Sequence, residues 1–185
     1  MPFPAKLNAE VIVRRATELL ESGDPEALSM RSLAGVLGVR ASSLYGHFPD
    51  RAALEGAIAD GAAHRMAAAI SAAAHGLGPE EALRAACHAY LGFARTHPLL
   101  YDLLLAPRAP AFATPGPSKD LWNLVLGLVG DVTGILDDTS ATVALWSFLH
   151  GFVALERSGQ FGLSGPLSGF ETGLNALVEG FTPSE

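Results

Sequence analysis

The chain has 185 residues, 49% of them hydrophobic and 17% charged, which is enough apolar material for a sizeable core and excludes disorder as a global description. Its single cysteine, Cys87, excludes an internal disulfide framework and a zinc site built from several cysteines. The net charge is −7, and the whole excess lies beyond residue 51, because residues 1–51 carry six basic and six acidic side chains.

The N-terminal part of the chain predicts three short helices. Asn8 is a good N-cap for a first helix, and apolar residues recur at helical spacing until the turn signal Gly23-Asp24-Pro25. Ser29 caps a second helix, and Gly38 supplies a tight turn before a third. Pro49-Asp50 then ends the third helix and caps the next one.

The rest of the chain also predicts helices, and no alternation typical of a strand persists anywhere. The alanine-rich segment 51–74 has high helix propensity and predicts a long connecting helix. Residues 106–117 contain four prolines and predict a loop, and 159–169 predict a glycine-rich connection. Further helices are expected over 80–96, 98–105, 119–132, 139–157 and 170–181. The predicted fold is all-α, with a three-helix head (residues 1–52) joined by the long helix to a helical body (residues 53–185).

The pair of helices around Gly38 has the layout of a helix-turn-helix, whose second helix enters the major groove of DNA. That second helix displays Arg40, Ser42, Ser43, Tyr45 and His47. Arginine can donate two hydrogen bonds to guanine, and hydroxyl and imidazole groups suit phosphates, which position a protein without specifying sequence. Double-stranded DNA is therefore the expected partner.

Two of these side chains, and Arg31 on the preceding helix as a third candidate for DNA contact, have a structural alternative. Tyr45 can pack its ring into the head, because tyrosine has an apolar body and a polar tip. His47 can interact only with the dipole at the end of its helix. Arg31, on the preceding helix, can be a solvated surface charge.

The run from Leu33 to Phe48 carries the pattern Leu-Ala-x-x-Leu-Gly-Val-x-x-x-Ser-Leu-Tyr-x-His-Phe. With its flanks, from about Asn8 to Ile58, it resembles the N-terminal domain of the TetR family of bacterial one-component repressors. The resemblance implies that Ser29 caps its helix against a DNA phosphate and that Arg51, where the family usually has lysine, contacts another. It implies further that Arg40, Ser42 and Ser43 face base edges or phosphates, while Tyr45 and His47 hold the backbone. The full expected DNA-binding set is Ser29, Arg31, Arg40, Ala41, Ser42, Ser43, Tyr45, His47 and Arg51.

In the body, the segment 141–156 is apolar nearly all round, as a surface helix cannot be. Either it lies at the centre of the body, or one face meets the core and the other meets a second subunit. The last helix is similar, so the two predict a four-helix dimer interface with two helices from each chain. The residues expected there are Phe148, Phe152, Leu155, Leu174, Leu177 and Phe181.

The spacing Trp146-x-x-x-His150-Gly151 resembles the WHG domain found in part of the TetR family. This resemblance implies a homodimer whose bodies hold a small-molecule pocket. The side chains expected to line one cavity are Phe93, Tyr101, Trp122, Trp146 and His150, with ordinary core packing as the alternative for each. The apolar body predicts a hydrophobic effector.

The predicted function is a repressor that binds a palindromic operator as a homodimer and is released by a ligand, with segment 51–74 as the lever. The alternative is a DNA-binding regulator or architectural protein without a small-molecule effector, controlled by a protein partner. No catalytic residue, metal ion or cofactor is expected, because the histidines form no metal-binding pair and Cys87 and His88 point apart on a helix. The N-terminus shows no signal peptide and no segment is long enough to span a bilayer, so a cytoplasmic protein is expected.

Overall fold

The computed structural model describes residues 7–23, 28–107, 116–162 and 167–182, and within these ranges the chain is built from helices without strands. The helices are α1 (Ala9–Glu21), α2 (Met30–Leu37), α3 (Ala41–Tyr45), α4 (Arg51–Ala74), α5 (Pro79–Thr96), α6 (Pro98–Leu105), α7 (Pro117–Thr133), α8 (Thr139–Arg157) and α9 (Leu167–Phe181). The all-α prediction is confirmed. So are the bounds expected for the segments that form α4, α6 and α8.

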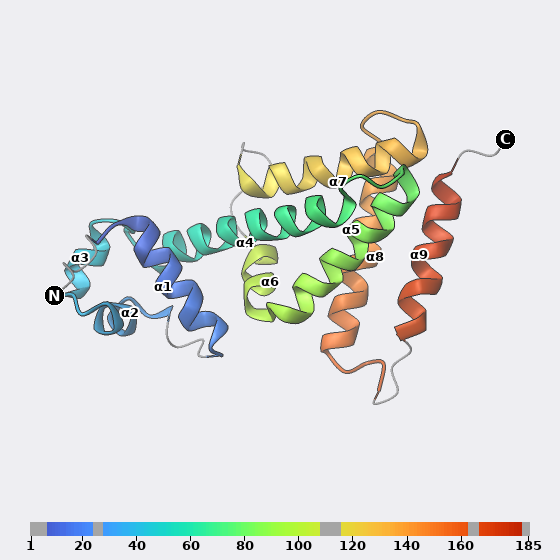
Figure 1. Cartoon of the computed structure of the whole chain (residues 1–185). Helices are drawn as coiled ribbons and strands as arrows, with labels where there is room; N and C mark the ends of the chain where they lie inside the picture. The colour runs from blue at the N-terminus through green and yellow to red at the C-terminus, as the bar shows by residue number, and fades with distance from the viewer. Residues whose placement is uncertain (1–6, 24–27, 108–115, 163–166, 183–185) are drawn as a thin grey trace.

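The molecule consists of a small head and a larger body, which the helix α4 joins (Figure 1). Helices α1, α2 and α3 form the head, and α4 runs from the head along the body. In the body, α4 packs against α5, α6 and α7, while α8 and α9 lie together at the end far from the head. Because one continuous helix serves both parts, any movement of α4 is felt in the head and in the body.

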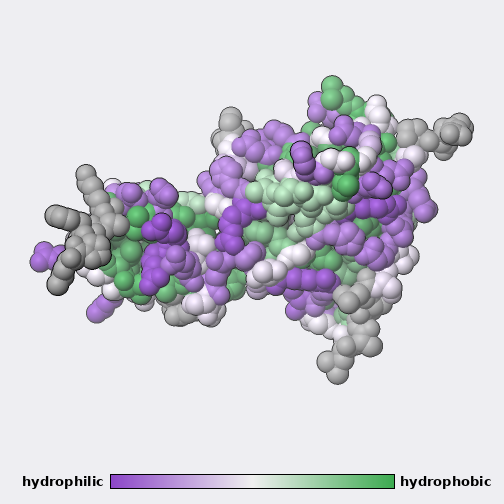
Figure 2. All heavy atoms as spheres, in the orientation of Figure 1, coloured by the Kyte–Doolittle hydropathy of each residue, from purple (hydrophilic) through white to green (hydrophobic). Residues whose placement is uncertain are grey.

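The buried face of α4 explains why it can hold both parts together. Large side chains alternate with alanines along this face, and all of them are nearly inaccessible to solvent: Leu54, Ile58, Ala59, Ala62, Ala63, Met66 and Ile70. Alanine keeps a high helix propensity and lets neighbouring helices approach closely. On the face shown in Figure 2, hydrophobic residues gather over the middle of the body, where α4 and α5 lie, with hydrophilic residues on either side.

The helix ends follow the capping chemistry expected from the sequence. The side chains of Asn8, Ser29 and Asp50 accept hydrogen bonds from the backbone N–H groups of Val11, Ser32 and Ala53, at 2.8, 3.1 and 2.7 Å. Each bond satisfies a donor that a helix start leaves without a partner. Three of the predicted N-caps are therefore confirmed.

Three helix starts differ from the prediction, and the smallest difference is in α5, which begins at Pro79 and not at residue 80. Helix α7 begins at Pro117 and not at residue 119, since proline is favoured in the first turn, where its missing N–H costs nothing. Helix α9 begins at Leu167 and not at residue 170, because a glycine such as Gly169 weakens a helix by only about 1 kcal/mol and does not end it. Most of the expected loop 106–117, and part of the expected connection 159–169, lie outside the described residues.

Candidate nucleic-acid interface and body cavity

The turn between α2 and α3 depends on the glycine at position 38. Gly38 has φ 67° and ψ 28°, a left-handed conformation that residues with a side chain rarely adopt. The N–H of Val39 donates to the carbonyl of Ala34 at 3.0 Å, and the N–H of Gly38 donates to that of Gly35 at 3.2 Å. This pair of bonds closes the last turn of α2 and sets the direction in which the chain enters α3.

Helix α3 is anchored on one side and open on the other. Leu44 is completely buried in the head, and the half-buried Ala41 packs against the same core. The side chains of Arg40, Ser42, Ser43, Tyr45 and His47 are all exposed. Tyr45 is 53% exposed, so its ring is not packed into the head. The structure therefore exposes five of the expected contact residues at and beside α3, whereas Ala41 lies toward the packed side.

The charges at this surface differ in how they are paired. Among the described residues, no carboxylate pairs with Arg31 or Arg40, and both arginines are exposed. Arg51 donates to Glu55 at 2.6 Å within α4, which offsets part of its charge. The Asp50 carboxylate caps α4, as described above. Arg40 thus carries a positive charge on the exposed side of α3 without an acidic partner.

Ion pairs connect the head to the body at the end of α1. The carboxylate of Glu21 lies 3.1 Å from Arg65 Nη1 on α4 and 2.6 Å from His97 Nδ1 at the junction of α5 and α6. Arg65 Nη2 also lies 3.2 Å from His97 Nε2. We call these three residues the junction triad. No sequence pattern predicts it, because its members lie far apart in the chain.

In the body, four of the five expected pocket residues form a chain of contacting rings through Tyr90. Trp122 contacts Trp146 at 5.9 Å between ring centroids, and Trp146 contacts Tyr90 at 5.8 Å. Tyr90 contacts Tyr101 at 5.8 Å, and Tyr101 contacts His150 at 6.1 Å. The buried ring of the fifth residue, Phe93, packs separately on His97, at 5.0 Å.

A hydrogen-bonded relay runs along the last part of this chain. The hydroxyl groups of Tyr90 and Tyr101 are 2.8 Å apart, and the Tyr101 hydroxyl lies 2.9 Å from Nδ1 of His150. Burial raises the pKa of Tyr90 and of Tyr101 above the usual value, so both hydroxyls stay protonated. His150 therefore has a hydrogen-bond partner inside the fold, while its side chain is exposed on α8.

A cavity of about 440 Å³ lies where the relay reaches the surface, between α6 and α8. The guanidinium of Arg157 donates to both oxygens of Asp102, at 2.5 and 2.7 Å, and lies 6.0 Å from the centre of the Tyr101 ring. The cavity is lined by Tyr101, Asp102, Leu105, His150, Val153, Ala154, Arg157 and Ser158. Two expected residues, Tyr101 and His150, line it, and Phe93, Trp122 and Trp146 do not.

The polar part of this cavity was missed from the sequence, although a signal was present. Asp102 is the only charged residue in the apolar helix α6, and Arg157 ends the mostly apolar α8. Isolated charges on apolar helices need partners. The mixed lining also differs from the purely apolar pocket expected for a hydrophobic effector.

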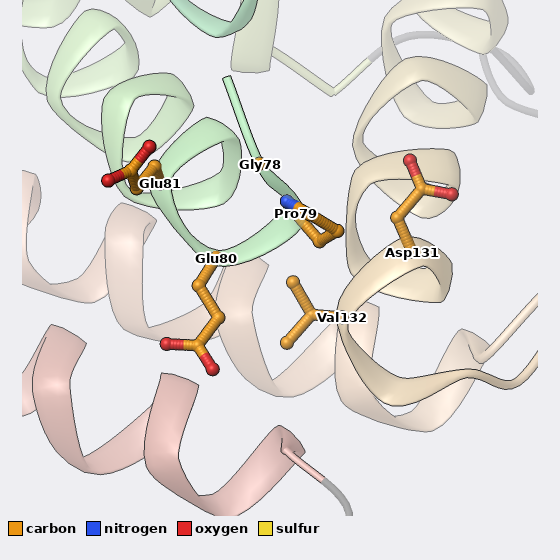
Figure 3. Close-up of a pocket in the computed structure, with 6 residues that line it drawn as sticks. All are labelled: Gly78, Pro79, Glu80, Glu81, Asp131 and Val132. Atoms are coloured by element: carbon orange, nitrogen blue, oxygen red, sulfur yellow. The ribbon is translucent and has the colours of Figure 1, made fainter.

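Two further cavities lie away from the relay. One, of about 350 Å³, is formed by the α4–α5 turn and the end of α7. Figure 3 shows Pro79 and Val132 facing each other there, while the carboxylates of Glu80, Glu81 and Asp131 point in separate directions. The other, of about 460 Å³, lies between the α7–α8 loop and the end of α9. In the described ranges, no group of three or more histidine, cysteine or acidic side chains is arranged to hold a metal ion.

Cys87 is buried in the body. Burial raises the pKa of its thiol to about 12, so the reactive thiolate is not formed at neutral pH. This environment suits a small packing residue and not a thiol sensor.

Helix α8 has one face in the core and one face in solvent, so it does not lie wholly inside the body of this chain. Phe152 and Leu174 are 8% and 0% exposed, so these two expected interface residues belong to the core of the chain itself. Phe148, Leu177 and Phe181 are half-buried, and Leu155 is 47% exposed. The solvent-facing side of α8 also carries the exposed His150, and its other residues are mainly small ones between two exposed aliphatic side chains: Val143, Ala144, Ser147, Gly151, Ala154 and Leu155.

The contact between α8 and α9 requires a glycine. A Cβ atom added at Gly173 would lie 2.4 Å from the ring of Phe148, which stacks on Phe170 at a centroid distance of 5.5 Å. The absent side chain lets the two helices pack closely.

No helix among the described residues combines the length and the hydropathy needed to span a bilayer.

Both parts of the chain match models of known families. Residues 12–58 match the model described as bacterial regulatory proteins, tetR family, and residues 83–177 match the tetracyclin repressor-like C-terminal domain. The second match includes the segment from Trp146 to Gly151, and the predicted membership of the TetR family is confirmed in both parts of the chain.

Individual proteins match along most of the chain. The uncharacterized HTH-type transcriptional regulator Rv0681 of Mycobacterium tuberculosis is 27% identical over 164 residues, which cover 84% of this chain and 73% of the relative. A structure of a protein of unknown function from Rhodococcus sp. RHA1 has a TM-score of 0.75 at 24% identity, covering 98% of this chain and 96% of the other. A structure of BioQ with its double-stranded DNA operator has a TM-score of 0.67 at 23% identity, covering 97% of this chain and 100% of the other. These two structures establish the fold.

Proposed function

The chain belongs to the TetR family of bacterial regulatory proteins, and we propose that it is a repressor that binds a palindromic operator as a homodimer and is released by a small molecule. Its family consists of DNA-binding transcriptional regulators, so we assign it no catalytic activity. The proposal divides the chain into a DNA-binding head, residues 1–52, and a body for ligand binding and dimerisation, residues 53–185. A repressor of chromosomal genes acts in the cytoplasm.

The exposed surface of α3 carries the proposal. Arg40 stands there without an acidic partner among the described residues, with hydroxyl and imidazole groups beside it. An arginine in this place can donate two hydrogen bonds to a guanine, and the neighbouring groups suit phosphates. The operator-bound structure of BioQ supports this use of the same fold.

A dimer supplies the second half of the recognition surface. One α3 reads only a few base pairs, whereas two related by a twofold axis read half-sites about 34–36 Å apart. The solvent-facing sides of α8 and α9 support the pairing. Small residues such as Ser147 and Gly151 allow helices of two copies to approach closely, and Val143 and Leu155 leave apolar area to be covered.

The α6–α8 cavity is the proposed effector site. Helix α6 lines this cavity at Tyr101 and Asp102, and it also packs against α1 of the head and against α4. A ligand that binds better to the state with the two heads at the wrong separation lowers operator affinity by linkage. Helix α4, which belongs to both parts, is the lever in this proposal.

Operator binding is tested by selecting bound sequences from random duplex DNA and then measuring variants on the selected site. Arg40→Ala should weaken binding by about 1–3 kcal/mol and relax the preference at one base pair. His47→Ala should weaken binding to all sequences alike. Arg95→Ala, which removes a positive charge from the body, where Arg95 pairs with Glu156, controls for the change in net charge. If Arg40→Ala and His47→Ala both bind every DNA as the parent does, α3 is not the recognition helix.

Dimerisation and release need separate measurements. If light scattering shows a monomer at micromolar concentration, the proposed homodimer and its palindromic operator are both wrong. Thermal melting against a broad set of small molecules tests for an effector, because any ligand of the native state raises the Tm. If no compound in the set raises the Tm, the result favours the alternative, a regulator controlled by a protein partner.

A further inference from the structure

We infer that the α6–α8 cavity binds a small organic carboxylate, which replaces Asp102 as the hydrogen-bond partner of Arg157. This inference deepens the proposed function, since it rests on the assignment of this cavity as the effector site. It names the chemical class of the effector and the contact that the effector replaces. Three features of the cavity support it.

First, the cavity already binds a carboxylate. The Arg157 guanidinium holds both oxygens of Asp102 in the forked geometry that matches arginine to a carboxylate. Asp102 is 53% exposed, so its carboxylate can be solvated by water when it leaves Arg157. A ligand carboxylate offers Arg157 the same bonds. An exposed ion pair of this kind contributes little free energy, so a ligand can compete with it.

Second, the relay leaves His150 with a donor for the ligand. Among the described residues, Tyr101 is the one hydrogen-bond partner of the buried Tyr90 hydroxyl. The Tyr90 O–H group is satisfied as a donor only if it donates to Tyr101. The Tyr101 hydroxyl then donates to Nδ1 of His150 at 2.9 Å. With Nδ1 as acceptor, the neutral imidazole carries its hydrogen on Nε2. His150 is exposed and lines the cavity, which makes this N–H available to a second ligand oxygen.

Third, the remaining lining suits a hydrocarbon group. Leu105, Val153 and Ala154 lie around the polar end, and the ring of Tyr101 forms a flat wall beside Arg157. A volume of about 440 Å³ falls in the range of small-molecule sites. The cavity thus pairs an anion-binding end with an apolar wall.

When a ligand displaces Asp102 from Arg157, the effect can reach the head through α6. The Asp102–Arg157 pair ties α6 to α8, and a ligand that takes Arg157 releases this tie. At its other end, α6 begins next to His97, which pairs with Glu21 of α1. Helix α6 therefore spans the distance between the effector and the junction triad.

The test measures ligand binding by calorimetry and thermal melting in the absence of DNA. The probes are hexanoate, the neutral hexanamide and the cationic hexylamine, with benzoate as a second carboxylate. We expect hexanoate or benzoate to bind and to raise the Tm, and the amide and amine to bind at least tenfold more weakly. Tighter binding of hexylamine would make Asp102 the recognition group and overturn the inference. Failure of both carboxylates to bind at millimolar concentration would overturn it as well.

Variants separate the roles of the two charged residues. Arg157→Gln should weaken carboxylate binding tenfold or more, because a charge-assisted hydrogen bond is lost. Asp102→Asn should strengthen it about threefold, because the internal competitor is gone. If Arg157→Gln proves unstable, Ala154→Leu replaces it in the test. This variant narrows the cavity, keeps Arg157 and should weaken carboxylate binding. Unchanged affinity in Arg157→Gln, or weaker affinity in Asp102→Asn, contradicts the inference.

Operator binding without any ligand reports on the proposed function separately. If the chain binds its operator and neither carboxylate binds, only the effector class is wrong. If a carboxylate binds through Arg157 and no operator is found, the cavity stands and the regulatory role falls.

Discussion

In the head, every residue of the candidate DNA-binding surface comes from positions 29–51, whereas the body cavity joins side chains that lie 49 and 55 positions apart. The head surface depends on one turn and one short helix, both set by local chemistry at Gly38 and Leu44. The body cavity exists only because the tertiary fold brings Tyr101 and Asp102 of α6 close to His150 and Arg157 of α8. A local motif can be recognised along the chain, and a site between distant helices cannot.

The largest expected effect tests whether the head depends on its own small core. Leu44 is fully buried, so Leu44→Ala should lower the free energy of unfolding by about 3 kcal/mol and should displace α3 from the operator. Urea unfolding followed by circular dichroism measures the first effect, and gel shift the second. Ser43→Ala, on the exposed side of α3, should change stability by less than about 0.5 kcal/mol. A loss below 1 kcal/mol in Leu44→Ala would show that α3 is held by other contacts.

The next effect tests how the body assembles its distant helices. Gly173→Ala places a Cβ 2.4 Å from the ring of Phe148, so we expect the free energy of unfolding to fall by about 2 kcal/mol and the proposed dimer to weaken. Gly127→Ala on α7 is the matched control, because its added Cβ meets nothing within 4 Å and alanine is the better helix former. We therefore expect Gly127→Ala to raise the free energy of unfolding. Equal effects of the two changes would rule out a close α8–α9 crossing.

The smallest effect concerns the connection between the two parts. Glu21 and Arg65 form a partly exposed ion pair between α1 and α4, which should contribute a coupling energy of about 0.5 kcal/mol. A double-mutant cycle with Glu21→Gln and Arg65→Gln measures it by urea unfolding. The pair of Arg15 and Glu18, within α1, gives the reference for an exposed pair that does not reach the body. A coupling of zero for Glu21 and Arg65 would leave α4 itself and the contacts of α1 with α6 and His97 as the connections.

Most helix bounds could be predicted because caps and breakers act locally. Asn8, Ser29 and Asp50 cap helices by bonds to residues three positions ahead, and proline or glycine marks most of the other ends. The start of α9 was missed because Gly169 lies inside the helix, where packing against α8 outweighs its low propensity. The expected interface residues Phe152 and Leu174 show the same limit, since hydrophobicity alone does not say which side of a helix faces the core.

The sequence by itself determined the all-α class, the helix-turn-helix and the family, because each depends on residues within a few turns of one another. It also placed Arg40 and its neighbours on the exposed side of α3, since Leu44 must be buried. Only the tertiary structure decided which rings meet, that Asp102 pairs with Arg157, and that Glu21 reaches Arg65 and His97. Those contacts depend on how whole helices pack, and helix packing is set by the sum of many side chains rather than by any one pattern along the chain.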